Sequence, residues 1–403
     1  MTVLQLTSIL SIEGICVNRM SFMDDLIGFN GSISVANEAN VSYMVFERKT
    51  RLKFKVCKCK GMTMNCRHTG CIELNNGEEV EKVKNHVYLG TIISSNGERF
   101  KDMNDRLTKS NSVANEIEQI CKTPELSILR FWYVKLLMNS CLDSKIKYGS
   151  ALWDILKYKS SQEKLDKIKP CLLKRVLQVP SSTPSVAVQY EFGVNDLTLD
   201  ILLEKIVLGV ETLKLDDNRL SKKILEAMLK KNVPGFCTEL VEACGIFHVS
   251  LDALKGEKDV REVLKKKAKE LQSVQLLSRM MANSKTDRVL VNGFSYNGAT
   301  MKYLTELDFV EARAIFMSRY RMWPTKANYP GRWSGDKCNI CDMNDTDEHI
   351  FSCPGYVDLI NGKVEYDMFW NDDVLNDMVK LKGVADIVLK IIERLEVVQS
   401  LNL

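Results

Sequence analysis

Proline is scarce in this chain, with eight among 403 residues. Because proline removes a backbone donor and interrupts helices, its scarcity argues against a chain divided throughout into short elements. A strong net charge is also absent, since 56 basic residues face 52 acidic ones and leave +4. Such a balance does not by itself indicate a nucleic-acid ligand, so the distribution of charge has to be considered. Hydrophobic content of 45% is that of an ordinary globular protein.

No run of 18 or more apolar residues occurs, which excludes a predicted transmembrane helix. The first residues, MTVLQLTSILSIEGIC, have no cationic leader and are interrupted by Glu13, so they make a poor signal peptide. The thirteen cysteines are odd in number and have no secretory context, which favours reduced thiols. We therefore expect an intracellular protein, cytoplasmic or nuclear, with no membrane partner.

The first hundred residues predict a small α+β unit. Residues 16–29 have the pattern of two short strands that meet at Asp24-Asp25, and 52–56 alternate apolar and basic side chains. Residues 86–98 are rich in β-formers and end in a Ser-Asn-Gly turn, while 33–48 fit a helix.

Beyond residue 100 the apolar spacing is helical, so the chain as a whole is predicted to be mostly α. Pro180 to Pro184 (PSSTP) form a clear linker. No internal repeat is present. The predicted helices are 101–121, 125–157, 161–178, 185–232, 237–285, 301–322 and 373–398.

Four metal-ligating side chains gather near the C-terminal end, in the stretch DKCNICDMNDTDEHIFSC. Cys338 and Cys341 are separated by two residues and can share a metal from one tight turn. His349 and Cys353 are four apart, which places them on one face of a helical turn. Three thiolates and one imidazole make a closed tetrahedral set, suited to structural Zn²⁺ and unsuited to catalysis.

A second collection comprises Cys57, Cys59, Cys66, His68 and Cys71. Its first pair has a single intervening residue on a predicted strand, which is poor geometry for zinc. Packed thiols are the simpler interpretation, and a second metal site is the alternative.

Asp24 and Asp25 are adjacent carboxylates at a predicted hairpin tip. They repel each other unless cations or donors compensate them. A two-metal phosphoryl-transfer centre needs such a pair to hold Mg²⁺ ions. Taken alone, the pair is better explained as a solvated turn, because two adjacent aspartates in a turn are common.

A resemblance to a known family follows from several segments taken in order. Phe22-Met23-Asp24-Asp25 resembles the aromatic-x-Asp-Asp motif of reverse transcriptases, and RLKFKVCKCKGM (51–62) is similar to the palm segment that follows it in non-LTR (LINE-type) retrotransposons. HVYLGTIISSNGE (86–98) resembles their Tyr-Leu-Gly primer-grip hairpin. Residues 145–154 and 173–194 are similar to their thumb and post-thumb segments, and the Cys/His stretch resembles their C-terminal module. The order, more than any single motif, carries the resemblance to the C-terminal portion of such an enzyme.

The resemblance implies a small α+β remnant of a polymerase palm, a helical thumb, a helical linker and a small zinc knuckle. The corresponding segments are 1–100, 101–184, 185–330, 331–360 and 361–403, the last a helical tail. The implied activity is RNA-directed DNA synthesis, with Asp24 and Asp25 as Mg²⁺ ligands and Tyr88-Leu89-Gly90 positioning the primer. In the family another catalytic aspartate and the fingers come earlier, and residues 1–23 contain no acid except Glu13. We therefore expect a truncated polymerase that is inactive alone.

Basic residues are concentrated between 145 and 175, where nine Lys and Arg face three acids, an excess of six positive charges. A helical pair with this charge can follow a phosphate backbone of RNA or DNA, and a solvated helix face is the alternative. Near the Cys/His stretch, Arg319 and Arg321 accompany Tyr320 and Trp323. The predicted nucleic-acid contacts, besides the Tyr-Leu-Gly hairpin, are Lys145, Lys147, Lys157, Lys159, Lys174, Arg175, Arg319 and Arg321.

Two further interpretations remain open from the sequence. The chain can be a non-enzymatic RNA- or DNA-binding protein derived from a retrotransposon, acting through thumb, linker and knuckle. It can also be the product of a decayed reading frame. The same residues would be present in either case.

Overall fold

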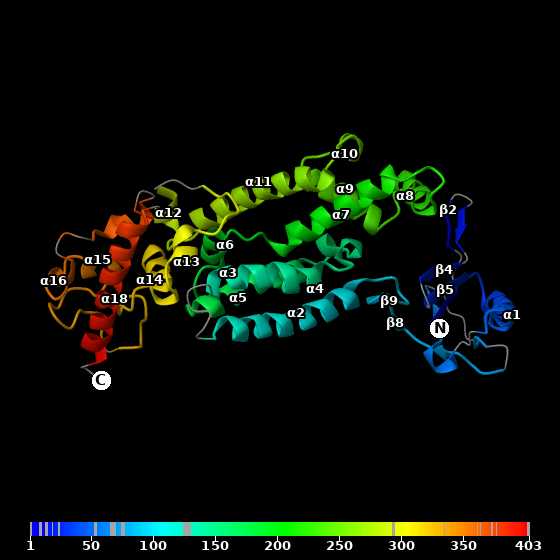
Figure 1. Cartoon of the computed structure of the whole chain (residues 1–403), viewed down its shortest axis with the longest axis horizontal. Coiled ribbons are helices and arrows are strands. Elements are labelled where there is room, and N and C mark those ends of the chain that lie inside the picture. Colours follow the sequence, from blue (N-terminus) through cyan, green and yellow to red (C-terminus); the bar gives the residue numbers. More distant parts are fainter. Residues whose placement is uncertain are drawn as a thin grey trace. The chain divides into compact units, whose positions relative to one another are not determined.

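The computed structural model is mostly helical, as the sequence predicts, and its elements are labelled in Figure 1. Contacts divide the chain into two compact units. The first unit contains 1–108, 146–159 and 201–262, and the second contains 109–145, 160–200 and 263–403. The structure describes residues 2–7, 10–12, 15–17, 19–22, 25–51, 55–64, 70–73, 77–123, 130–291, 295–333, 335–360, 362, 364–371, 374–375 and 377–400.

A sheet near the N-terminus has the strand order β4-β5-β1-β6-β7. Strand β1 pairs in parallel with β5 on one side and β6 on the other, while β4 and β5 form an antiparallel hairpin. A separate antiparallel pair is formed by β2 (Leu10–Ile12) and β3 (Ile15–Val17). The strands of the larger sheet are β1 (Thr2–Thr7), β4 (Arg19–Phe22), β5 (Asp25–Asn30), β6 (Lys60–Thr63) and β7 (Glu81–Lys82).

Helix α1 (Ile33–Thr50) contacts this sheet and begins at Ser32, whose hydroxyl accepts the Val35 N–H. Ala36 of α1 shares a small core with Cys59, Ile72 and Val80. Cys59 is thus a packed thiol, as the simpler interpretation of the second cysteine collection has it, and Cys57 is exposed. Cys66 and His68 lie outside the described residues.

A second hairpin, β8 (Asn85–Tyr88) and β9 (Thr91–Ser94), follows the sheet in sequence. Its Tyr88 and Ile93 pack against Ile27 of β5 and Met62 of β6. The antiparallel hairpin therefore shares a core with the sheet.

The helical part of the first unit is held by a buried polar network. Lys205 lies in α7 (Leu197–Lys214), is fully buried, donates to the Trp153 carbonyl at 2.7 Å and pairs with Glu239 of α9 (Phe236–Ile246). The Trp153 indole in turn donates to Asp102 of α2 (Phe100–Cys121) at 2.7 Å. The short turns η4 (Ser150–Leu152) and η5 (Ile155–Lys157) flank Trp153, and α8 (Leu220–Lys230) and α10 (Leu251–Lys255) follow. Helix α11 (Val260–Met281) begins in this unit, and most of its length belongs to the second.

Helix 125–157, predicted as continuous, is interrupted in the structure. Residues 124–129 are outside the described part. Helix α3 (Arg130–Leu137) continues through a π-helical turn, η3 (Met138–Leu142), into α4 (Asp143–Lys147). Gly149 then adopts a left-handed φ of 72°, which ends the helix, because residues with a side chain rarely adopt this backbone conformation.

In the second unit, α5 (Lys159–Leu177) carries a buried lysine, Lys169, that lies 3.0 Å from Asp143 and 3.3 Å from Asp200. Helices α6 (Ser185–Phe192), α12 (Asp287–Val291), α13 (Lys302–Glu306), α14 (Phe309–Arg319), α15 (Asp347–Ile350), α16 (Val357–Ile360) and α18 (Met378–Ser400), with the turn η6 (Tyr366–Trp370), complete it. Helix α18 packs along α14 (Figure 1).

Replacing Asp166 with asparagine is expected to stabilise the chain at neutral pH. Asp166 of α5 accepts hydrogen bonds from the N–H and hydroxyl of Thr198, at 2.8 and 3.0 Å. Burial and the neighbouring charge of Asp196 raise the pKa of Asp166 to about 6, against the opposing effects of the Thr198 hydrogen bonds and of Arg279. A raised folded-state pKa means that the protonated acid stabilises the fold at low pH, and this contribution is lost as the pH rises through about 6.

Asparagine keeps the hydrogen-bonding shape and carries no charge. Its advantage should grow between about pH 4 and 6 and reach about 1–2 kcal/mol at neutral pH, a value reduced because the carboxylate is only half-buried. Urea unfolding of both proteins near pH 4 and near pH 7.5 measures it. The same difference at both pH values would contradict the assignment.

Candidate metal centre

The first two metal-ligating residues are presented by a tight turn. Cys338 donates its N–H to Met343 at 2.7 Å and accepts the Asp342 N–H at 3.1 Å, and Lys337 forms a bridge with Asn344. Asp342 closes the turn with a left-handed φ of 59°. The two-residue spacing between Cys338 and Cys341 therefore brings both sulfur atoms to one side.

The other two ligands come from α15 and the turn after it. The Thr346 hydroxyl accepts the His349 N–H at 3.2 Å and starts the helix. One turn later Cys353 returns to the same point, so that the four ligand atoms all lie within 4.8 Å of one another. This group of Cys338, Cys341, His349 and Cys353 can hold a metal ion.

The distances fit a tetrahedral ion. Cys353 Sγ lies 3.8 Å from both Cys338 Sγ and Cys341 Sγ, which matches the edge of a zinc–thiolate tetrahedron, about 3.8 Å for Zn–S bonds of about 2.3 Å. Cys341 Sγ lies 3.1 Å from His349 Nε2. The sulfur atoms are too far apart for disulfides, and all three cysteines are free.

The ligands are enclosed, with Cys353 fully buried and Cys338 nearly so. Trp323, Phe351 and Phe369 form an aromatic cluster with each pair at 5.6–6.0 Å and close to edge-on, and Trp323 and Phe369 are buried. A Cβ at Gly355 would lie 2.3 Å from Ile340 Cδ1, so any larger residue there would require the Ile340 side chain to move. A closed four-ligand site leaves no position for an activated water, so the geometry is that of a structural site.

Helix α18 is hydrogen-bonded to the segment that carries the four ligands, called the zinc module below. Gln399 donates to Asp345 at 2.8 Å and to the Pro324 carbonyl at 3.1 Å, and Asn339 donates to the Val398 carbonyl. Arg394 donates to the Gly355 carbonyl at 2.9 Å and pairs with Asp358. These hydrogen bonds join residues up to 75 positions apart and carry no motif, so sequence patterns did not predict them.

Burial raises the pKa of Cys353 to about 12 in the absence of a cation, with the neighbouring thiols adding to the shift and the Gly355 N–H opposing it. Three thiols and an imidazole at one buried point therefore fit a bound cation, which would stabilise the thiolates. The donor set is consistent with zinc.

The carboxylate pair falls at the edge of the described region. Asp24 lies outside the described residues, and Asp25 begins β5, where its backbone pairs with Phe22. The predicted two strands meeting at this pair correspond to the β4–β5 hairpin.

The turn between β8 and β9 is held from two sides. Leu89 and Gly90 both have positive φ, 47° and 73°, as in a type I′ hairpin turn. The Tyr148 hydroxyl donates to the Leu89 carbonyl at 2.7 Å, and Arg106 donates to the Gly90 carbonyl at 2.6 Å. Arg106 also lies over the Tyr148 ring. The sequence pattern did not indicate this clamp.

The predicted basic contacts separate by exposure. Lys145, Lys157, Lys159 and Arg175 are exposed and Lys147 is half-buried, although Arg175 pairs with Glu118 at 2.7 Å. Two residues are corrections. Arg319 is 3% exposed and pairs with Glu191 at 2.9 Å. Lys174 is 9% exposed and donates to the Ser181 carbonyl. Both side chains are buried and bind groups inside the protein, so they do not belong to a nucleic-acid surface. Arg321, in contrast, is one-third exposed.

Within the described residues, no helix is long and apolar enough to cross a membrane. No protein-family model matches the sequence, and comparisons with curated proteins and with solved structures find no significant similarity.

Proposed function

We propose that this chain is the C-terminal portion of a non-LTR retrotransposon reverse transcriptase and that it binds RNA or DNA through its basic helical segments and a structural zinc module. The polymerase reaction it would serve is templated DNA synthesis, with Asp24 and Asp25 as Mg²⁺ ligands. The zinc assignment rests on the Cys₃His geometry, and the family assignment rests on the ordered motifs.

One observation carries the proposal: the hairpin with Tyr88-Leu89-Gly90 packs in one core with the strand that Asp25 begins. Tyr88 and Ile93 contact the cluster of Ile27 and Met62, and Ile27 lies two residues after Asp25. A primer-positioning hairpin has to lie near the metal-binding carboxylates. This packing supports the polymerase interpretation.

The first unit presents aromatic and basic side chains near both ends of the β8–β9 hairpin: Tyr148 at the clamped turn, and Phe100 with Tyr158 and Lys157 close to Glu98. Tyr148 is 53% exposed, and Phe100 is 37% exposed and lies 5.1 Å from the Tyr158 ring. Lys157 lies over Tyr158. Exposed rings offer stacking to bases and lysines offer contacts to phosphates, which together suit a nucleic-acid strand.

Neutralising Lys147, Lys157 and Lys159 together, each to glutamine, is expected to weaken nucleic-acid binding. Each phosphate contact contributes about 0.7–0.9 to the slope of log K against log salt, so the slope should fall by about two and affinity at low salt by roughly tenfold or more. Fluorescence anisotropy with a labelled single strand, titrated at several salt concentrations, measures both quantities.

The matched control replaces Lys223, Lys231 and Lys258, which are exposed lysines of the same unit. An equal loss in the control would show that general charge, and not this surface, determines binding. No measurable affinity at low salt would contradict binding altogether. The non-enzymatic alternative predicts the same binding, and neither interpretation expects nucleotide incorporation by the purified chain. Mg²⁺-dependent templated incorporation would exclude the non-enzymatic alternative and would also overturn the expectation that the chain is inactive alone.

A further inference from the structure

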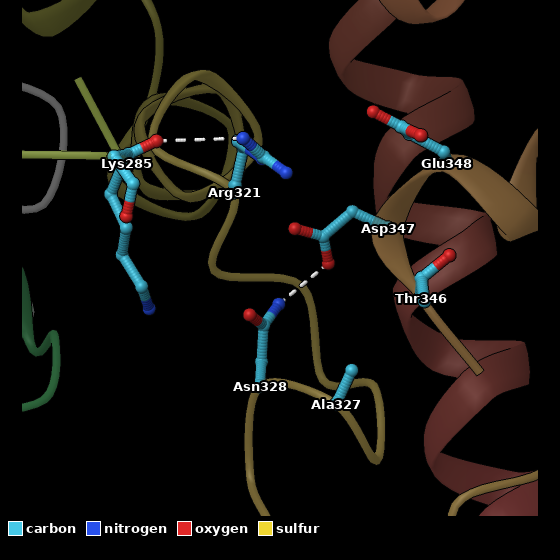
Figure 2. Close-up of a pocket in the computed structure, with 8 residues that line it drawn as sticks. Lys285, Arg321, Ala327, Asn328, Thr346, Asp347 and Glu348 are labelled. Atoms are coloured by element: carbon cyan, nitrogen blue, oxygen red, sulfur yellow. Dashed lines mark hydrogen bonds between the residues drawn. The ribbon is translucent and has the colours of Figure 1, made fainter. Parts of the chain in front are cut away.

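A cavity of about 300 Å³ lies beside the metal-ligating group in the second unit. Four segments form its walls, as Figure 2 shows. They are the turn after α11, the second residue after the end of α14, the loop that follows that residue, and the first residues of α15 with the residue before them. The side chains that matter are Lys285, Arg321, Asn328 and Asp347. Its volume is at the lower end for small-ligand pockets and suits one nucleotide.

One wall offers hydrogen-bond acceptors. The Asn328 amide nitrogen donates to the Trp323 carbonyl at 3.0 Å and to Asp347 Oδ1 at 2.5 Å, which fixes the orientation of the amide. The Asn328 oxygen consequently points away from Asp347, toward the side of the cavity where Lys285 lies (Figure 2). The carboxylate of Asp347 and this amide oxygen present acceptors side by side.

The opposite side is cationic. Arg321 Nη1 pairs with Asp287 at 3.9 Å, the Arg321 side chain extends toward Asp347, and Lys285 lies on the same side of the cavity (Figure 2). Arg321 donates one N–H to the Ser284 carbonyl at 3.4 Å, which positions the guanidinium at the rim. The remaining donors suit a phosphate group.

The backbone of Arg321 is strained. It follows Tyr320, the C-cap of α14, with a left-handed φ of 53°, and the next residue, Met322, closes the helix end by donating its N–H to the Met317 carbonyl at 2.8 Å. Glycine is usual at this position, since a side chain there is unfavourable. This conformation, which Arg51 also adopts at the end of α1, places a charged group at the cavity.

We propose that this cavity binds one unpaired guanine nucleotide, with its phosphate at Arg321 and Lys285 and its base edge at Asp347 and Asn328. Guanine presents two adjacent donors, N1–H and the N2 amino group, which match two adjacent acceptors. Adenine presents an acceptor at N1, which would face the carboxylate. The inference rests on the nucleic-acid binding proposed above and names the base that the second unit would recognise.

A bound metal ion would affect this cavity through the segment that carries both a metal ligand and part of the cavity wall. Thr346, Asp347 and Glu348 directly precede His349, so an ion that holds His349 also holds the acceptor wall in place. Guanine binding should therefore require the metal-loaded protein, and chelation should abolish it.

The test is calorimetric titration of the zinc-loaded full chain with GMP, AMP and guanosine. GMP should bind about tenfold more tightly than AMP or guanosine. Asp347→Asn should lose about tenfold for GMP, because a donor then faces the base donors. Asp342→Asn is the matched control, since it removes an exposed charge of the same module outside this cavity. It should leave GMP binding unchanged.

Arg321→Gly separates binding from folding. Relief of the strained backbone should raise the melting temperature by about 2 °C, while GMP affinity falls to that of guanosine. Equal binding of GMP and AMP, equal losses in Asp347→Asn and Asp342→Asn, or no saturable GMP binding would each overturn the guanine site.

Binding of an oligo(U) strand is measured in parallel, because it contains no guanine. A chain that binds oligo(U) but does not prefer GMP keeps the proposed function and loses this inference. A chain that prefers GMP but binds no polymer keeps the guanine site and contradicts the proposed nucleic-acid function.

Discussion

Replacing Cys338 and Cys341 together with serine is expected to release one zinc ion per chain and to unfold the module around it. Structural zinc contributes about 10–16 kcal/mol in small zinc-binding peptides near neutral pH, which exceeds the whole stability of a typical domain. The four ligand atoms lie within 4.8 Å of one another and would hold one ion together. Loss of two thiolates should therefore abolish zinc binding, because serine oxygen is a poor substitute for thiolate. The aromatic core of Trp323, Phe351 and Phe369 would be exposed to water in the variant.

Zinc content by mass spectrometry of the metal and tryptophan fluorescence of the unfolding transition measure these effects. Cys141→Ser is the matched control, because Cys141 is an exposed free thiol of the same unit and is not part of the group. It should retain both zinc and the transition. Full zinc content in the double serine variant would contradict the ligand assignment.

The metal-ligating group could be predicted from the sequence because its geometry is local. Two residues between Cys338 and Cys341 determine a tight turn, and three between His349 and Cys353 determine one helical turn. The support behind it could not be predicted, since Gln399 and Arg394 reach the module from α18, and such contacts depend on how distant segments pack.

Helical content was also predictable, because apolar spacing of 3.6 residues is a local signal. The breaks were less so. The π-helical turn at Met138–Leu142 and the glycine at 149 divide a segment whose apolar pattern continues through both. Short strands in the first thirty residues pair in parallel through β1, which the local pattern does not reveal, since partners far apart in sequence set the pairing.

The basic residues show most clearly that local composition does not predict which side chains are exposed. Lys145 and Lys157 of the run from 145 to 175 are exposed, whereas Lys169 and Lys174 of the same run are buried. Nothing local distinguishes them. Whether a lysine is buried depends on an acidic partner, such as Asp143 for Lys169, and only the fold brings the two together.

Replacing Arg319 with methionine is expected to cost about 3–5 kcal/mol of unfolding free energy, because it leaves Glu191 charged and buried. Glu191 Oε1 accepts from Arg319 Nε at 2.9 Å and from the Tyr320 hydroxyl at 2.6 Å, and both charged partners are almost fully buried. Arg319 also donates to the Phe369 carbonyl at 2.5 Å, so it joins α6, α14 and η6. A surface arginine that contacted nucleic acid would show no such loss.

The double variant Glu191→Gln with Arg319→Met tests whether the loss comes from the unpaired charge. Removal of both charges should recover all but about 1–2 kcal/mol, since no buried ion then remains. Arg261→Met is the matched control: Arg261 makes two hydrogen bonds to Glu204 but is half exposed, so its loss should be below about 1 kcal/mol. Urea unfolding of the wild-type chain, Arg319→Met, Glu191→Gln, the double variant and Arg261→Met measures the cycle and its control. Equal losses for Arg319 and Arg261 would show that burial does not determine the strength of the Glu191 pair.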